Sequence, residues 1–157
     1  MVWMVATYKI NELKRLKDNL KNQRFEYFHP KIQIKKNNRP LSEEPMFPGY
    51  IFIYADVNNY QKIKYTKGIS KIIRFNKNIA ILDEQEIIEL KKIQEDSLFE
   101  PIVPKISVGQ EAIMSDGPLK GSFITIASLP HKDRVNILVH ILGKKRNITV
   151  PLNEIKI

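Results

Sequence analysis

Few residues in this chain have both the type and the spacing that catalysis requires. The three histidines, His29, His131 and His140, show neither the H-x-x-x-H nor the H-x-E spacing that brings zinc ligands and a general base together. Glu43 and Glu44 are neighbouring carboxylates in a polar stretch with no acid-base partner beside them, which indicates acidic surface. The chain has no cysteine, which excludes thiolate zinc sites and a cysteine nucleophile. We therefore predict no catalytic residue, no metal site and no cofactor.

One glycine-containing loop has a superficial likeness to a phosphate-binding loop. The segment DGPLKGS, residues 116–122, lacks the G-x-x-x-x-G-K-[ST] order and the preceding strand-to-helix context. Asp116 and Gly117 suit a tight turn between strands, and Gly121 permits a close backbone approach. An enzyme is therefore the least favoured class.

The charge balance points to a polyanionic partner. Lys and Arg number 26 against 17 Asp and Glu, a formal net charge of +9 at pH 7. Such a surface attracts nucleic acid through phosphate contacts that weaken as salt rises, although lysine-rich surfaces can also serve solubility alone. The N-terminal residues lack the apolar core and cleavage site of a signal peptide, so a cytoplasmic protein without a membrane segment is expected.

Hydrophobic periodicity predicts an α+β domain in the first 97 residues. Strands are predicted at residues 2–9, 26–34, 50–56 and 68–75, and helices at 11–22, 58–67 and 83–96. Asn11 can cap the first helix, and Asp83 with Glu86 resembles a capping box at the start of the last. This is the βαββαβ order of an antiparallel ferredoxin-like sheet with one added helix.

The pattern changes after Ser97. Residues 98–107 contain two prolines and no periodicity, which predicts a linker. Short strands are then predicted at residues 111–115, 122–129, 134–142 and 147–152, with turn-rich connections between them. Closely spaced strands without a convincing helix predict a small antiparallel β-barrel over residues 108–157.

Motifs in both halves resemble the NusG family of transcription elongation factors. The first half contributes VWMVATYK, FPGYIFI and TKGISKIIRF, and the second contributes VGQEAIMSDGPLKGSFITIASL and RVNILVHILGKKRNITVPLNEIKI. The resemblance implies a ferredoxin-like NGN domain over 1–97, a linker over 98–107 and a KOW barrel over 108–157. It also implies a monomer that acts by binding RNA polymerase.

The branch of the family is less plainly marked. FPGY suits general NusG, whereas KIIRFN is similar to a strand end of the specialised RfaH-type paralogues, and the absence of an insert in the first half agrees with that type. Asn59, Tyr60 and Gln61 stand where RfaH-like factors carry a His-Thr-Thr contact element. We favour an RfaH-like elongation and antitermination factor. A general NusG-type elongation and termination factor and a ribosome-associated KOW protein that binds RNA are the alternatives.

The apolar run that follows the Pro-Gly pair is the candidate docking element. Alternation places Tyr50, Phe52 and Tyr54 on one face of a strand and the intervening isoleucines on the other. Taken alone, both faces could belong to the core. The resemblance implies that this region meets the clamp helices of the largest RNA polymerase subunit. The candidate polymerase-binding residues are Phe47, Pro48, Tyr50 and Phe52.

Basic residues on the polar face of the first predicted helix and at strand ends and loops form the candidate nucleic-acid site. The resemblance implies that they lie near the exposed non-template DNA strand, although each could simply be solvated. They are Lys9, Arg15, Lys62, Lys64, Lys67 and Arg74. In the barrel, Phe123, Ile141 and Leu142 are candidates for contact with a small ribosomal subunit protein or the termination factor Rho, or else for the barrel core.

The RfaH resemblance also implies a second state, in which the C-terminal domain is a helical hairpin. RVNILVHIL, residues 134–142, has apolar residues at both helical and strand spacing and suits either state. Gly121 and the β-branched residues after it disfavour a helix in the other half. Glu44 and Arg134 match the positions of an interdomain ion pair of the RfaH type. A permanent barrel on a free linker remains the alternative.

Overall fold

The computed structural model describes residues 1–103 and four residues beyond them, which are Arg134, Val135, Leu138 and Leu142. The described residues fall into two compact units. The first unit contains Met1–His29, Gly49–Asp83 and Leu142, and the second contains Pro30–Pro48, residues 84–103, Arg134, Val135 and Leu138.

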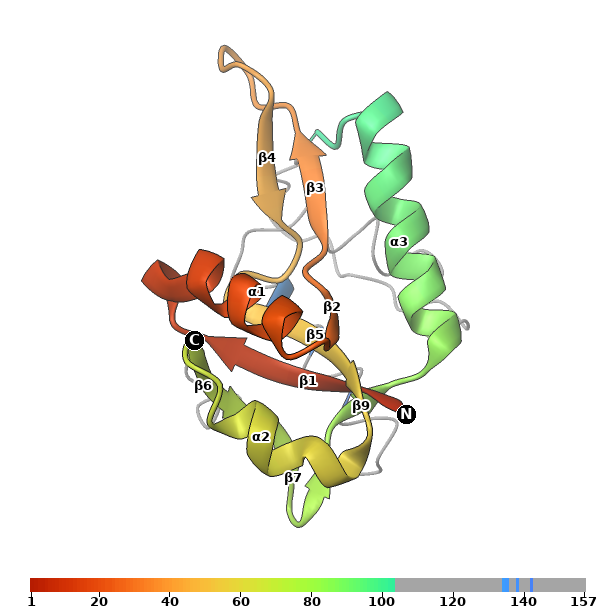
Figure 1. Cartoon of the computed structure of the whole chain (residues 1–157). Coiled ribbons are helices and arrows are strands. Elements are labelled where there is room, and N and C mark those ends of the chain that lie inside the picture. Colours follow the sequence, from red (N-terminus) through yellow and green to blue (C-terminus); the bar gives the residue numbers. More distant parts are fainter. Residues whose placement is uncertain (104–133, 136–137, 139–141, 143–157) are drawn as a thin grey trace. The chain divides into compact units, whose positions relative to one another are not determined.

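The first unit is built on an antiparallel sheet whose strand order is β2-β5-β1-β6 (Figure 1). Its strands are β1 (Val2–Tyr8), β2 (Glu26–Phe28), β5 (Tyr50–Ala55) and β6 (Ile69–Ile72), and β9 (Ile81–Leu82) also pairs with β1. Nearly every residue of β1 is buried, as expected for a central strand. The order is that of a ferredoxin-like sheet, which confirms the predicted fold.

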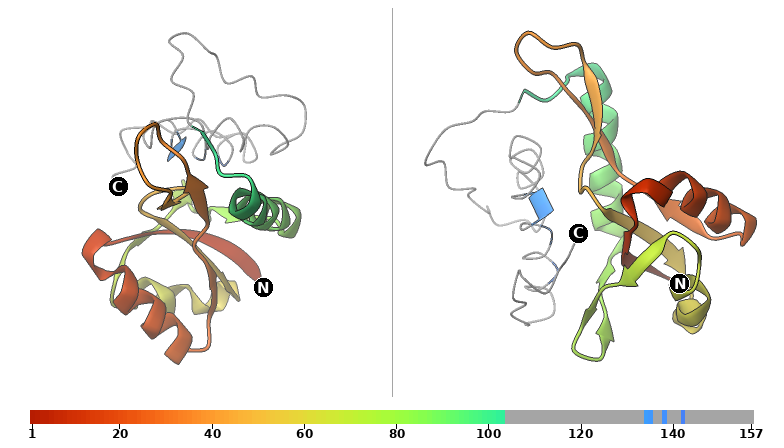
Figure 2. Two further views of the ribbon diagram at one scale, coloured as in Figure 1. Left: turned by 90° about the horizontal axis from the view of Figure 1, so that it is seen from above. Right: turned by 90° about the vertical axis from the view of Figure 1, so that its left-hand side faces the viewer.

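Two helices supply the apolar cover for one face of this sheet (Figure 2). They are α1 (Leu13–Asn22), preceded by the 3-10 turn η1 (Ile10–Glu12), and α2 (Tyr60–Lys64), preceded by η2 (Val57–Asn59). Leu16 and Leu20 of α1 and Ile63 of α2 are fully buried in one cluster with Ile51 and Ile53 of β5.

The cap predicted for the first helix is wrong. Asn11 lies inside η1, and Glu12 occupies the N-cap position of α1 without a side-chain capping bond. A side-chain cap is found instead at η2, where the Asp56 carboxylate accepts a hydrogen bond from the Asn58 backbone N–H at 2.8 Å.

The single strand predicted over residues 26–34 is also wrong, because it is broken in two at Pro30. β2 pairs with β5 in the first unit, whereas β3 (Lys31–Ile34) pairs with β4 (Ser42–Pro45) in the second. Proline has no N–H to donate to a ladder. Its carbonyl instead accepts a hydrogen bond from the Met46 N–H at 2.8 Å.

The sequence SEEP of β4 predicts a loop, because it has no apolar alternation. Side chains support its pairing with β3. The Glu43 carboxylate forms an ion pair with Lys31 Nζ at 3.0 Å and accepts a hydrogen bond from the Gln33 amide at 3.2 Å. The strand predicted over residues 68–75 is likewise divided, into β6 and β7 (Arg74–Phe75), and β7 pairs with β8 (Asn78–Ile79).

The last helix of this part, α3 (Glu84–Phe99), packs along β3 in the second unit (Figure 2). Two of its side chains accept hydrogen bonds from β3, Gln94 from the Lys31 N–H at 2.8 Å and Ser97 from the Gln33 N–H at 3.1 Å. Ile102 then pairs with β3 as an isolated parallel bridge. The edge of β3 is therefore closed by α3 and by the chain that follows it.

The four described residues beyond 103 all have helical backbone conformation and are buried. Val135, Leu138 and Leu142 are spaced by three and four residues, as on one face of a helix. At these four positions the backbone is helical, which differs from the predicted barrel strand. The other barrel strands, the DGPLKGS turn, Phe123 and Ile141 lie outside the described residues.

Candidate functional site

The cations predicted to meet nucleic acid are all exposed and all belong to the first unit. Lys9, Arg15 and Lys67 lie at or beside α1, and Lys62, Lys64 and Arg74 lie at or beside α2. Between Asp56 and Asp83 the chain has six cations and no carboxylate.

A glycine brings the cations at α1 together. Gly68 has φ +104°, and a Cβ built on it would lie only 2.6 Å from Leu16 Cβ, so the loop passes directly against the helix. The Lys9 N–H donates to the Gly68 carbonyl at 2.9 Å, and the Asn19 amide donates to the Lys67 carbonyl at 3.3 Å. These backbone contacts hold Lys9 and Lys67 beside the helix that carries Arg15.

The cations at α2 are paired with aromatic rings. The Arg74 guanidinium lies 4.4 Å from the ring centroid of Tyr60. Lys62 Nζ lies 5.4 Å from that of Phe25, and Lys64 Nζ lies 5.6 Å from that of Tyr65. All three are within the range of cation–π attraction. The sequence-based prediction named these cations but not the aromatic residues that pair with them. The signal was present in the sequence, since aromatic and basic residues alternate in NYQKIKYTK, residues 59–67.

The candidate polymerase-binding residues are mostly buried. Phe47, Tyr50 and Phe52 are no more than 1% exposed, and Pro48 is partly exposed. As the alternation predicted, Phe52 is separated from the Ile51 and Ile53 cluster, and its ring lies 6.3 Å from that of Phe28. These aromatic residues belong to the packed interior in this state.

Tyr50 is a buried phenol in an apolar setting. Burial raises its pKa to about 12, and its hydroxyl has no hydrogen-bond partner among the described residues. The turn before it is held by Gly49, which has φ +86°. The Gly49 N–H donates to the Tyr8 hydroxyl at 3.3 Å, and its carbonyl accepts from the Tyr8 N–H at 3.0 Å.

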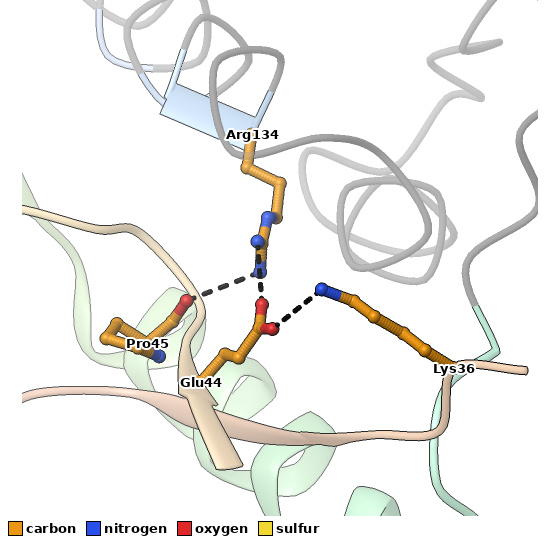
Figure 3. A network of polar contacts seen from close by, with 4 residues as sticks. All are labelled: Lys36, Glu44, Pro45 and Arg134. Carbon is orange, nitrogen blue, oxygen red and sulfur yellow. Dashed lines mark hydrogen bonds and ion pairs between the residues drawn. The ribbon is translucent and has the colours of Figure 1, made fainter. Parts of the chain in front are cut away.

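Glu44 and Arg134, 90 residues apart in the chain, form an ion pair in the second unit at 3.4 Å (Figure 3). The Arg134 side chain is 2% exposed and also donates to the Pro45 carbonyl at 3.3 Å. The other carboxylate oxygen of Glu44 forms an ion pair with Lys36 Nζ at 3.1 Å. Burial lowers the pKa of Arg134, and the hydrogen bond and charge of Glu44 oppose that shift.

Comparison with known proteins assigns the family. The family model described as "Transcription termination factor nusG" matches residues 1–91. This chain belongs to the NusG family. NusG proteins are non-enzymatic transcription elongation and termination factors that bind RNA polymerase, and the matched residues include both candidate sites of the first 91 residues. The structure is also similar to one described as "Domain interaction in Thermotoga maritima NusG", with a TM-score of 0.42 and 15% identity over 71% of this chain and 68% of that one.

Two further observations accompany the NusG assignment. Among the described residues, no group of three or more His, Asp and Glu side chains is arranged to hold a metal ion. No helix in that part of the chain is both long enough and apolar enough to cross a bilayer.

Proposed function

We propose that this chain is an RfaH-like NusG protein that suppresses pausing or termination of transcription. It binds the clamp helices of the largest RNA polymerase subunit through Phe47, Pro48, Tyr50 and Phe52. Its exposed cations contact the non-template DNA strand. The family match supports the polymerase-binding part of the proposal, because the matched residues 1–91 contain both the aromatic run and the cations.

Binding alone is sufficient for this activity. A factor that stabilises the elongating conformation of the polymerase by about 1.4 kcal/mol shifts the paused fraction about tenfold. Tyr50 and Phe52 are suitable anchors, since buried aromatic side chains dominate interface energies. The Tyr50 hydroxyl, which has no described partner here, gains a hydrogen bond if the polymerase supplies an acceptor.

In this proposal the burial of these aromatic residues belongs to a closed state. Polymerase contact requires that whatever covers Phe47, Tyr50 and Phe52 moves away. The Arg134 contacts hold the chain at Glu44 and Pro45, directly before the aromatic run, and the described residues near Arg134 are helical. Both features support an RfaH-type closed state in which the C-terminal segment is helical.

In the open state the domains are those expected from the sequence, an NGN domain over 1–97, a linker over 98–107 and a KOW barrel over 108–157. The barrel then recruits a small ribosomal subunit protein or Rho through Phe123, Ile141 and Leu142. Leu142 is buried in the described structure, so this contact also requires opening.

Co-purification tests the proposal. Tagged protein is expected to retain RNA polymerase subunits after nuclease treatment, because the main contact is between proteins. Retention of ribosomal RNA and proteins in their place, with loss after nuclease, would instead assign the chain to a ribosome-associated role. A general NusG-type elongation and termination factor is the second candidate, favoured by the FPGY motif at residues 47–50.

A further inference from the structure

Three strand ends of the first unit meet where β5 begins. β1 and β2 both pair antiparallel with β5, so the C-terminal ends of both lie beside the N-terminal end of β5. Tyr8 is the last residue of β1, His29 directly follows β2, and Gly49 directly precedes β5. All three residues belong to the first unit. Polar contacts among them therefore fix the backbone at the start of β5.

The Tyr8 hydroxyl joins these three ends. It lies 3.0 Å from His29 Nε2 in a buried contact, and it accepts a hydrogen bond from the Gly49 N–H at 3.3 Å. The Tyr8 and His29 rings meet edge to face with their centroids 5.4 Å apart, and both residues are buried. Buried hydrogen bonds of this kind hold their partners in a defined geometry, because breaking one leaves a polar group unsatisfied.

The direction of these two bonds assigns a role to His29. A backbone N–H can only donate, so the Tyr8 oxygen is the acceptor toward Gly49. The hydroxyl hydrogen is then directed to His29, whose Nε2 accepts it when the ring is neutral and carries its hydrogen on Nδ1. The bonds form a chain from His29 through Tyr8 to Gly49, and each strengthens the other. Loss of the His29 acceptor therefore weakens the bond to Gly49.

The turn at Gly49 is where such support matters. Gly49 has φ +86°, a conformation that favours glycine, and glycine restricts the backbone least of all residues. The direction in which β5 leaves the turn consequently depends on contacts from outside it. Tyr8 supplies two of these contacts, since its own N–H also donates to the Gly49 carbonyl at 3.0 Å. Tyr50 follows Gly49 directly, so a change in the turn moves its side chain.

We propose that His29 is a positioning residue for polymerase binding, which acts by fixing the Tyr8 hydroxyl and, through it, the turn that presents Tyr50 and Phe52. The inference rests on the proposed function for the identity of the partner. It adds a residue that acts through Tyr8 and requires no contact of its own with the polymerase.

The test compares the affinity of full-chain variants for core RNA polymerase with their stability in urea. His29→Leu fills the buried position but removes the acceptor, and it is expected to weaken polymerase binding about fivefold, the effect of one buried hydrogen bond. His29→Gln is the rescue variant, because its amide oxygen can replace Nε2, and it is expected to bind as the wild type does. Tyr27→Phe removes a hydroxyl from β2 and is the matched control, with no expected effect.

Tyr8→Phe tests the same chain of bonds from its centre and remains informative if His29→Leu does not fold. It removes only the hydroxyl and is expected to weaken polymerase binding as much as His29→Leu does. The double variant should bind no more weakly than either single variant, because both changes break one chain of contacts. Without polymerase, hydrogen exchange at the Gly49 amide should be faster in both single variants and unchanged in His29→Gln.

The outcomes separate this inference from the proposed function. Wild-type affinity in His29→Leu, together with weakened binding in Tyr50→Ala, would overturn the role of His29 and leave the polymerase contact in place. Equal weakening by His29→Gln and His29→Leu, in proportion to lost stability, would overturn it as well and make His29 a structural residue. Wild-type affinity in Tyr50→Ala would overturn the proposed contact itself, whereas exchange at the Gly49 amide would still report whether His29 fixes the turn.

Discussion

At the scale of single residues, the ion pair between Glu44 and Arg134 has the largest consequence. Arg134 is almost completely buried, and Glu44 is its only described carboxylate partner. A buried cation that loses its partner is strongly destabilising, whereas an exposed pair contributes little. The contact is therefore a place where one substitution can separate the C-terminal segment from β4.

We predict that Glu44→Ser destabilises the closed state by about 3 kcal/mol, because it leaves the Arg134 guanidinium buried without a carboxylate. Polymerase affinity should rise, and hydrogen exchange near residue 134 should become faster. Glu43→Ser is the matched control on the same strand, since Glu43 is exposed and pairs with Lys31. Unchanged exchange and unchanged affinity in Glu44→Ser would contradict a closing role for this pair.

The buried phenol of Tyr50 predicts a pH dependence. Its pKa is raised to about 12 from 10.0, so the folded state holds this proton more tightly than the unfolded chain. The resulting contribution to the free energy of unfolding is complete below pH 10 and is lost as the pH rises toward 12. Absorbance of phenolate during an alkaline titration measures it.

Tyr50→Phe provides the comparison. This variant should lose the part of the alkaline destabilisation that belongs to Tyr50, and its stability at neutral pH should equal or exceed that of the wild type by about 1 kcal/mol. The reason is that the hydroxyl is buried without a described partner. A large loss of stability at neutral pH would show that the hydroxyl is hydrogen-bonded after all.

At the scale of elements, the close passage of the Gly68 loop against α1 positions three cations. Gly68→Ala is predicted to lower the free energy of unfolding by about 2 kcal/mol, because its Cβ would lie 2.6 Å from Leu16 Cβ and φ is +104°. Urea denaturation followed by Trp3 fluorescence measures the loss. Ser70→Ala, at an exposed position of the following strand, should change stability by less than about 0.5 kcal/mol.

The positions of two strands show the limit of prediction from hydrophobic periodicity. Residues 26–34 are predicted as one alternating strand, but Pro30 divides them between two sheets. The sequence SEEP is predicted as a loop, but it pairs with β3 through backbone bonds and charged side chains. In both cases the partner strand decides the outcome, and that partner is distant in the sequence.

At the scale of the whole molecule, the charge of the first unit predicts how strongly the factor depends on salt. Neutralising Lys9, Arg15, Lys64 and Lys67 together should weaken binding to an elongation complex with an exposed non-template strand. The slope of log affinity against log salt should fall by up to about 0.7 for each phosphate that the protein no longer neutralises. Titration at several salt concentrations measures both quantities.

A second set of exposed cations provides the control for total charge. Neutralising Lys21, Lys35, Arg39 and Lys92 removes the same number of charges and should change the slope much less. Equal effects of the two sets would assign the salt dependence to net charge alone and not to the predicted site.

Local sequence was enough to determine the fold class and most of the element order. Apolar alternation and helical spacing identified β1, β5, α1 and α3, because these patterns depend on neighbours within a few residues. The ferredoxin-like order followed from their sequence along the chain. The exposure of the six predicted cations was also expected, since lysine and arginine keep their charges in water.

Only the tertiary structure decided which of the candidate side chains are accessible and which of them meet. Both faces of β5 are apolar, so alternation could not say whether Tyr50 and Phe52 are covered, and the structure buries them. The contact of Glu44 with Arg134 and the rings beneath Lys62 and Arg74 join residues that are distant along the chain. Such contacts depend on how the chain is packed in space, which no local pattern of residues specifies.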